Sequence, residues 1–384
     1  MTVAESVTLA DLEADPHPTL HRLRSESPVA WVPAMGGWLV TSRELAVDVM
    51  RDPDTFTVDD PRFSTAQVIG PSMLSTDGAS HDRHRAPFVE AYGGRRVDED
   101  LSAEVETDAL RLVTEIRPTG AAELRSSVAA PLAVTTAVRS LGLSGVDPAQ
   151  ILGWYSAIVE TVQAIAAGST DTSTGAEAFA DLSTAVGRSI EARDGSLLAE
   201  ASLTDLTEGE VASNAAVIMF GGIETSESAT ASALLHLLSH PDQLDAVRSD
   251  RALLPNAIEE SFRLEPAAAS VDRYATRTTD LGGTVIAEGD YLSVSLAAAN
   301  RDPAVFAYPD RFHITRPNSR QHATFAYGPH ACLGIHLARM ETGAALGAVL
   351  DLLPGIRLDT ASTVGPRGLV FRKPVAVSAR WNAA

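Results

Sequence analysis

The chain has 384 residues, of which 45% are hydrophobic, so it can bury a large core. Its 50 Asp and Glu residues outnumber its 30 Lys and Arg residues, and the formal net charge of −20 argues against nucleic acid or an anionic membrane as the main partner. A single cysteine excludes an intrachain disulfide and fits a reducing compartment.

The N-terminal segment and the apolar runs give no sign of export or membrane insertion. Residues 1–15 carry acidic side chains and lack the apolar stretch of a signal peptide. The longest wholly apolar run near mid-chain, 215–223, spans nine residues, whereas a membrane helix needs about 20. We therefore expect a cytoplasmic protein that spans no membrane.

The first half of the chain predicts short helices with a little strand between them. The predicted elements are a helix over 15–24, strands over 29–32 and 37–41, a helix over 44–51 capped by Ser42, an irregular loop over 56–77, a helix opened by His81 and interrupted near Gly93, and helices over 99–116, 131–141, 148–167 and 176–192. A small, polar connection over 168–175 separates the last two helices.

The middle of the chain predicts one long helix. Thr207 and Glu210 fit a capping box, and an apolar-rich helical pattern runs from there to about His240, before Pro241. A helix of this length that is apolar on most sides must cross the core. Two adjacent glycines at 221 and 222 interrupt it at mid-length.

The C-terminal part mixes helix and strand. The predicted elements are helices over 241–248 and 256–264, strands over 272–279, 284–286 and 291–295, a meander of loops over 300–317, a helix over 335–350, and short strands in the last 30 residues. We therefore expect a mainly α fold with small β-sheets, built as one domain over residues 1–384.

The only cysteine, Cys332, lies at a predicted junction between a loop and a helix. A helix N-terminus favours the thiolate, and Gly328 and Gly334 let the backbone approach a bulky group closely. Three kinds of role are open. A lone cysteine is most often a small buried hydrophobe; a nucleophile would need a better placed base than His330; and a metal ligand for zinc would need further ligands that the surrounding sequence lacks. A haem iron needs only one protein ligand on one face.

The segment 325–334, with Phe325, Gly328, His330, Cys332 and Gly334, resembles the haem-binding signature of the cytochrome P-450 superfamily in its bacterial form. Other signatures of that family follow in the expected order, so the resemblance covers nearly the whole chain. They are His81-x-x-x-Arg85 for the propionate-binding helix, Gly221-Gly222-Ile223-Glu224-Thr225 for the oxygen-activation motif, Glu260-Ser261-Phe262-Arg263 for the Glu-x-x-Arg of the core helix, and 300–303 with 309–312 for the meander.

The resemblance implies a cytochrome P-450 fold in which the long central helix lies over a haem b. Cys332 would be the fifth ligand of the iron. The propionates would be held by His81, Arg85, Arg273 and His330, because buried carboxylates need charged or hydrogen-bonding partners.

On the other face of the haem, the resemblance assigns Glu224 and Thr225 as the catalytic pair. Thr225 would hold bound oxygen and a water, and Glu224 would help to bring protons from solvent. The two glycines before this pair would leave room for dioxygen, whereas the alternative reading is close helix packing. An acid and a hydroxyl at the apolar middle of a core-crossing helix are costly without a purpose.

Glu260 and Arg263 are three residues apart on one helical face and can pair. On the surface such a pair contributes under about 1 kcal/mol. The resemblance implies instead a buried network with a third cation, Arg311 or Arg316, that fixes the meander. His313 replaces an aspartate that is common in the meander, and Ala326 falls at a variable position of the signature, so we expect neither to matter.

The predicted function is that of a haem-thiolate monooxygenase, which inserts one oxygen atom from dioxygen into a small organic substrate of secondary metabolism. A separate ferredoxin and ferredoxin reductase would supply electrons to a monomer, docking near Cys332 and Arg339. Two alternatives are a peroxide-driven peroxygenase and a non-catalytic haem-binding protein, and the pair Glu224 and Thr225 argues against both. The substrate would contact mostly small, apolar segments, namely 68–74, 217–221, 268–271 and 369–371.

Overall fold

The computed structural model describes residues 2–143, 145–166, 169–193 and 195–383. Its helices are α1 (Val3–Ser6), α2 (Leu9–Ala14), α3 (His17–Glu26), α4 (Arg43–Arg51), α5 (Ser64–Ile69), α6 (Gly78–Val89), α7 (Gly94–Asp100), α8 (Ser102–Ile116), α9 (Ala130–Leu141), α10 (Pro148–Ala166), α11 (Ser173–Ala192), α12 (Leu197–Ala201), α13 (Glu208–Leu238), α14 (Pro241–Ser249), α15 (Leu254–Leu264), α16 (Leu296–Ala299) and α17 (Ile335–Leu352). Tighter or wider helical turns form η1 (Pro33–Met35), η2 (Arg117–Thr119), η3 (Arg125–Ala129), η4 (Arg251–Leu253) and η5 (Ser319–Gln321).

The strands are short and make small sheets. They are β1 (Val29–Val32), β2 (Gly37–Val40), β3 (Phe56–Thr57), β4 (Ala121–Glu123), β5 (Ser270–Ala275), β6 (Thr279–Leu281), β7 (Thr284–Ile286), β8 (Tyr291–Ser295), β9 (Arg357–Leu358), β10 (Val364–Arg367), β11 (Lys373–Ala376) and β12 (Ser378–Arg380). The largest sheet has the order β1-β2-β8-β5-β3, with β2 and β8 parallel. The prediction of a mainly α fold with small β-sheets is confirmed.

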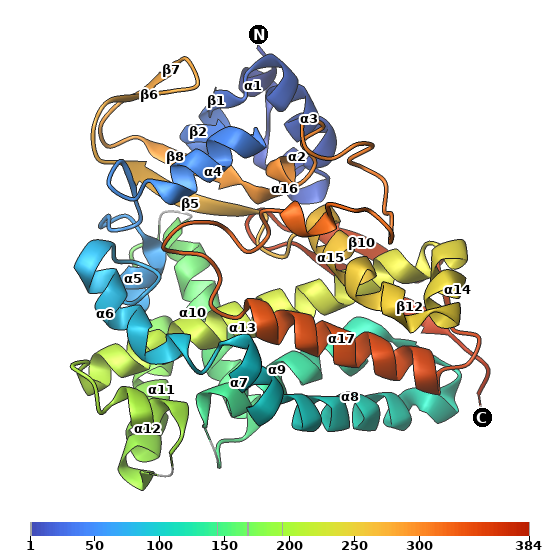
Figure 1. The fold of residues 1–384 in the computed structure, drawn as a ribbon. Coiled ribbons are helices and arrows are strands. Elements are labelled where there is room, and N and C mark those ends of the chain that lie inside the picture. Colours follow the sequence, from blue (N-terminus) through green and yellow to red (C-terminus); the bar gives the residue numbers. More distant parts are fainter. Residues whose placement is uncertain (1, 144, 167–168, 194, 384) are drawn as a thin grey trace.

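Two regions are visible in Figure 1. The N-terminal helices and the largest sheet lie at the top of the view, and the long helices α8, α13 and α17 lie below them. Strand pairing joins distant parts of the chain, since β2 pairs with β8 and β4 pairs with β12. Among the described residues, no helix combines the length and the apolar character that a bilayer crossing requires.

The long central helix is confirmed as α13, which has 31 residues. Thr207 is its N-cap, and the Thr207 hydroxyl and the Glu210 side chain form the predicted capping box. The helix packs against α9, α11, α15 and α17, so neighbours cover most of its sides. This packing explains why its apolar residues follow no single stripe.

The prediction of an irregular loop over 56–77 is wrong in part. The segment contains the short strand β3 and the helix α5, which buries Thr65, Val68 and Ile69 and packs against α10 and α11. A helix of six residues is not stable by itself, so tertiary packing rather than local pattern produces it.

Several boundaries also differ from the predictions. The helix predicted over 99–116 begins at Ser102, because Leu101 has φ −125° and separates α7 from α8. The strand predicted over 272–279 is two strands, β5 and β6. The helix predicted over 148–167 is described as far as Ala166, and residues 167 and 168, where the predicted connection begins, lie outside the described residues.

Candidate functional site: a cysteine loop, a cationic cluster and the middle of α13

The cysteine loop, residues 325–334, is folded back on itself. The backbone N–H of Cys332 donates to the carbonyl of Phe325 at 2.8 Å, and α17 begins just after the loop. Gly328 has φ +74°, and a Cβ at this position would lie 2.2 Å from the carbonyl oxygen of Met50 in α4. Only glycine fits there, which fixes the loop against α4.

Ala326 in the same loop has φ +56°, in the left-handed region that favours glycine. The expectation that alanine does not matter here is therefore wrong for stability, since this backbone conformation costs an L-residue about 1–2 kcal/mol. His313, in contrast, is exposed. Its backbone N–H, and not its side chain, donates to Glu260, so this contact places no constraint on which side chain stands at position 313.

The thiol of Cys332 lies deep in the protein but is not packed in the core. The residue is exposed, yet burial raises the pKa of the thiol, while the backbone N–H of Gly334 and the charges of Arg85 and Arg339 favour the thiolate. A residue that is both deep and accessible faces an internal space. The reading of Cys332 as a small buried hydrophobe is therefore wrong.

Helix α6 brings cationic groups to the cysteine loop. The Arg85 guanidinium donates to the carbonyl of Ala331 at 2.6 Å, directly before Cys332. The His81 ring lies edge-on to the His330 ring, with centroids 4.5 Å apart. The predicted residues His81, Arg85, His330 and Cys332 thus lie together.

Arg273 joins this cationic cluster from β5. It is 4% exposed, donates to the carbonyl of Asp272 at 2.7 Å, and feels the charge of Asp77. His330 Nε2 lies 2.7 Å from Asp77 Oδ1, so the imidazole faces this carboxylate. This contact also disfavours His330 as the base of a nucleophilic cysteine.

Asp77 is a site residue that sequence reasoning missed. Burial alone would raise the pKa of its carboxyl, but hydrogen bonds from His330, Thr57 and the backbone N–H of Val58 outweigh burial and hold the pKa well below its ordinary value. In the sequence, its position directly before α6 indicates a helix cap, but the side chain forms no cap hydrogen bond and binds His330, Thr57 and Val58 instead.

The cationic cluster fits the two carboxylates of a haem. His81 Nε2 is buried and has no hydrogen-bond partner among the described residues. Burial, followed by the nearby His330, lowers the pKa of His81, and burial also lowers the pKa of Arg273. Buried donors with one acid, Asp77, between them are suited to additional anionic oxygens.

The middle of α13 is open on one face. Gly221 is exposed although Met219 and Ile223 are 1% and 2% exposed, and a Cβ built on Gly221 would meet nothing within 4 Å. Close helix packing therefore does not explain Gly221, whereas Gly222 does face a neighbour, the Cβ of Ala137, at 3.6 Å. The hydroxyl of Thr225, one turn later, donates to the carbonyl of Gly221.

Glu224 is held by two residues that sequence reasoning missed. The hydroxyl of Tyr155 in α10 donates to Glu224 Oε2 at 2.7 Å, and Lys373 Nζ in β11 lies 3.0 Å from Glu224 Oε1. Burial and the negative charge of Glu224 raise the pKa of Tyr155 well above its ordinary value, so the phenol remains a donor. The sequence contained one indication for Lys373, namely that it is the only lysine of the chain.

Three of the four segments expected to contact substrate, 217–221, 268–271 and 369–371, meet near this part of α13, whereas 68–74 contacts Ser213 and Asn214 nearer its start. Phe220 and Phe371 pack edge to face with centroids 5.2 Å apart, and Tyr155 lies 6.4 Å from Phe220. The backbone of Ala269 donates to the carbonyl of Val370 at 2.7 Å, which joins two of the predicted segments.

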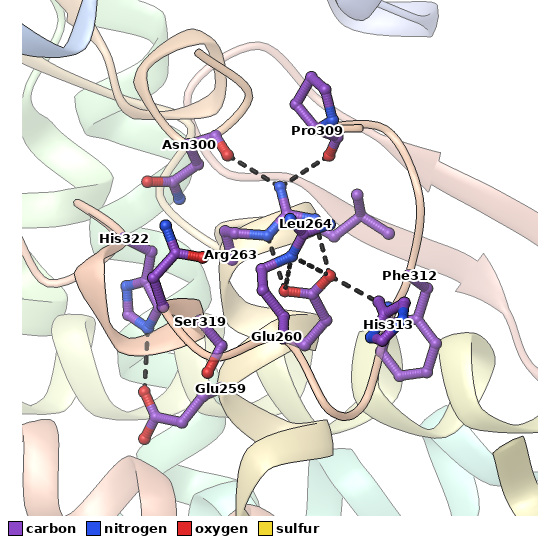
Figure 2. A network of polar contacts seen from close by, with 12 residues as sticks. Glu259, Glu260, Arg263, Leu264, Asn300, Pro309, Phe312, His313, Ser319 and His322 are labelled. Atoms are coloured by element: carbon purple, nitrogen blue, oxygen red, sulfur yellow. Dashed lines mark hydrogen bonds and ion pairs between the residues drawn. The ribbon is translucent and has the colours of Figure 1, made fainter. Parts of the chain in front are cut away.

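The buried network of the core helix is present (Figure 2). Arg263 donates to Glu260 at 2.7 and 2.8 Å, and its Nη1 also reaches the carbonyls of Asn300 and Pro309. The third cation is Arg316, which donates to Glu260 at 2.9 Å; Arg311 contributes only its carbonyl oxygen, as an acceptor.

A second acid on the same helix was missed. Glu259 accepts hydrogen bonds from His322 and Arg339, and these contacts outweigh burial, which alone would raise its pKa, and lower that pKa to about 2. The Arg339 guanidinium also lies 5.4 Å from the ring centroid of Phe325 in the cysteine loop. Arg339 therefore ties this loop to α15 rather than standing as a free surface cation.

Comparison with known proteins is consistent along the whole chain. The family model for cytochrome P-450 matches residues 188–353. The chain is 34% identical to cytochrome P-450 monooxygenase PikC of Streptomyces venezuelae over 97% of this chain and 92% of that protein. It is 33% identical to 20-oxo-5-O-mycaminosyltylactone 23-monooxygenase of Streptomyces fradiae over 88% of this chain and 82% of that protein.

Among solved structures, that of CalO2 superposes with a TM-score of 0.87 at 27% identity, covering 100% of this chain and 99% of that chain. Identity above 30% over nearly the full length of PikC establishes common descent and not only a shared fold. The chain therefore belongs to the cytochrome P-450 family, whose members bind haem b through a cysteine thiolate, and it is a monooxygenase of the bacterial branch.

Proposed function

We propose that this enzyme inserts one oxygen atom of dioxygen into a largely apolar secondary metabolite, with Cys332 as the ligand of the haem iron. The observation that carries the proposal is the thiol of Cys332, which is deep but accessible and is flanked by the Gly334 N–H and Arg85. When bound, a haem with a thiolate ligand would supply the activation of dioxygen and the transfer of oxygen to the substrate.

The protein would bind the haem through the cationic cluster. His81, Arg85, Arg273 and His330 would hold the propionates, and the unpaired Nε2 of His81 supports this assignment. His330 would then exchange or share its contact with Asp77. The Gly334 N–H would donate to the Cys332 sulfur and moderate its negative charge.

Glu224 and Thr225 would move protons on the α13 side of the haem. Thr225 donates to the carbonyl of Gly221, at the point where α13 is open, and its hydroxyl can rotate to hold a water there. Glu224 directly precedes Thr225 and contacts Lys373, whose side chain is more exposed than its own. These positions support a relay from solvent to the open face of α13.

The aromatic residues near Glu224 support a bulky, mostly apolar substrate. Phe220, Phe371 and the ring of Tyr155 offer apolar surface, and the nearby charges of Glu224 and Lys373 pair with each other. One relative is named as the 23-monooxygenase of 20-oxo-5-O-mycaminosyltylactone, and this similarity supports our proposal of a large organic substrate of secondary metabolism here.

A ferredoxin and its reductase would supply the electrons, in the cytoplasm and to a monomer. The acidic balance of the chain and its single cysteine are consistent with this setting. We also propose that residues 1–384 form one domain, which the pairing of β2 with β8 and of β4 with β12 supports.

Isotope labelling tests the proposed reaction. Candidate substrates are first selected by the low- to high-spin shift that they cause in the haem spectrum. The best binder is then incubated with ¹⁸O₂, a ferredoxin, its reductase and NADPH, and the product should contain one ¹⁸O atom. Product formed equally well from hydrogen peroxide without reductant would favour a peroxygenase, and binding without any product would favour a non-catalytic haem protein.

A further inference from the structure

Lys373, the only lysine among 384 residues, contacts two acids of α13. Its Nζ lies 3.0 Å from Glu224 Oε1, 3.1 Å from Glu224 Oε2 and 3.2 Å from Glu227 Oε2. Glu224 and Glu227 are three residues apart and share a helical face. An ammonium group, with three donors on a flexible stem, can span both carboxylates.

The surrounding charges balance. Arg125 in η3 donates to Glu227 Oε1 at 2.6 Å, so the cluster contains two cations and two carboxylates. The side chains of Lys373 and Arg125 are 30% and 26% exposed, whereas that of Glu227 is 8% exposed. The side chain of Glu224 is 17% exposed, so Lys373 is the more exposed partner of that contact, and the cluster leaves no unpaired charge to bind an ionic substrate.

Both carboxylate oxygens of Glu224 are occupied. Lys373 contacts both, and the Tyr155 hydroxyl donates to Oε2 at 2.7 Å. Tyr155 comes from α10 and Lys373 from β11, so two elements far apart in the sequence fix one side chain of α13. Lys373 and Tyr155 therefore fix the position of the carboxylate through which a proton would pass.

We propose that Lys373, together with Tyr155, is a positioning residue that holds the Glu224 carboxylate between solvent and Thr225. This inference rests on the proposed function, in which Glu224 moves protons. Lys373 follows Phe371 by two residues, and Phe371 and Tyr155 both pack near Phe220. A substrate that contacts these rings therefore touches the same two segments that hold Glu224, namely α10 and residues 371–373. The position of the substrate and the position of the Glu224 carboxylate thus depend on the same segments.

The first test measures coupling, the fraction of consumed NADPH that is recovered as product, as a function of pH. Lys373→Met should lower coupling by about tenfold, less than the roughly 10²–10⁴-fold contribution of an acid–base group itself, because Glu224 remains, and it should alter the pH profile. Lys373→Arg keeps the charge and should restore much of the coupling. Substrate affinity, measured by the spin shift, should change less than coupling does.

Arg380→Met is the matched control, because Arg380 pairs with Asp359 at the surface of β12 and contacts no group of the site. It should leave coupling and the pH profile unchanged. Coupling in Lys373→Met that equals the wild-type value across the pH range would overturn the proposal, as would an equal loss in Arg380→Met.

The second test detects the contact between Lys373 and Glu224 by NMR, without enzyme turnover. Biosynthetic incorporation of lysine labelled with ¹³C at Cε keeps all three donors of the ammonium group and labels only Lys373, so the protein gives one lysine resonance. Glu224→Gln and Tyr155→Phe should each shift that resonance, whereas Arg380→Met should not. An unshifted resonance overturns the proposal. A wild-type enzyme that forms no product overturns the proposed function and the positioning role with it, while the shifted resonance still reports the contact.

Discussion

The imidazole of His330 lies 2.7 Å from the carboxylate of Asp77, which ties the cysteine loop to the start of α6. Asp77 also accepts hydrogen bonds from Thr57 and the N–H of Val58, so one partly buried carboxylate joins three segments. The contact keeps His330 beside His81, and Arg273 feels the charge of the same carboxylate, so all three lie where the propionates of a haem would need them.

Replacing this carboxylate should destabilise the protein in a pH-dependent way. The pKa of Asp77 lies well below its ordinary value of 3.8, so the ionised group stabilises the fold above that pH and loses this effect as the pH falls. We expect Asp77→Asn to lower the unfolding free energy by about 1–3 kcal/mol at pH 7. Denaturant titrations should show the difference from wild type shrinking below about pH 4, and a constant difference would contradict the assignment.

The left-handed backbone at Ala326 predicts a stabilising substitution. Ala326→Gly should raise the unfolding free energy by about 0.5–1 kcal/mol, because the strain relieved at φ +56° exceeds the extra entropy of glycine in the unfolded chain. Ala331→Gly is the control in the same loop, and it should be neutral or destabilising. Thermal unfolding of the haem-loaded protein measures both, and equal shifts would show that Ala326 is not strained.

The two arginines of the meander predict unequal effects. Arg316 is buried and donates to Glu260, whereas the exposed Arg311 offers the network only its carbonyl. Arg316→Met leaves Glu260 with one fewer partner and should cost about 3 kcal/mol, while Arg311→Met should cost less than about 1 kcal/mol. Unfolding in denaturant and haem content after purification check this, and similar losses in both variants would refute the distinction.

Glu341 predicts a loss of stability with rising pH. Its carboxyl on α17 is 1% exposed, and burial raises its pKa to about 8, although the hydroxyls of Ser226 and Thr136 favour ionisation. Between the ordinary value of 4.5 and about 8, the folded state binds more protons than the unfolded state, so the unfolding free energy falls as pH rises.

The variant Glu341→Gln removes this titration. It should be nearly as stable as wild type at pH 4.5 and more stable by about 2 kcal/mol or more at pH 8. Denaturant unfolding at both pH values measures the difference, and one that does not grow with pH would show that Glu341 is ionised in the fold.

Local sequence signals predicted the long helices well and the short helix α5 poorly. The capping box at Thr207 and the apolar run behind it sufficed for α13, since both are encoded in neighbouring residues. Helix α5 depends on packing against α10 and α11, which no local pattern encodes. The sequence also left open whether Arg311 or Arg316 joins the core network, because the path of the meander decides which guanidinium turns inward.

The same limit applies to the candidate site. The resemblance to the family's signatures pointed to Cys332, Arg85 and Glu224, and the structure brings Arg85 beside the cysteine loop. Tyr155 and Lys373 contact Glu224 across separations of 69 and 149 residues, and such pairs carry no signature in a single sequence. Only the rarity of lysine in this chain could have drawn attention to Lys373.

The difference spectrum of the reduced protein with carbon monoxide tests the central claim, that Cys332 is the thiolate ligand of a haem iron. We predict a strongly red-shifted Soret band for the wild-type protein and the loss of that band in a folded, haem-containing Cys332→Ala variant. Absence of the band from folded, haem-replete wild-type protein, or its persistence in Cys332→Ala, would contradict the claim.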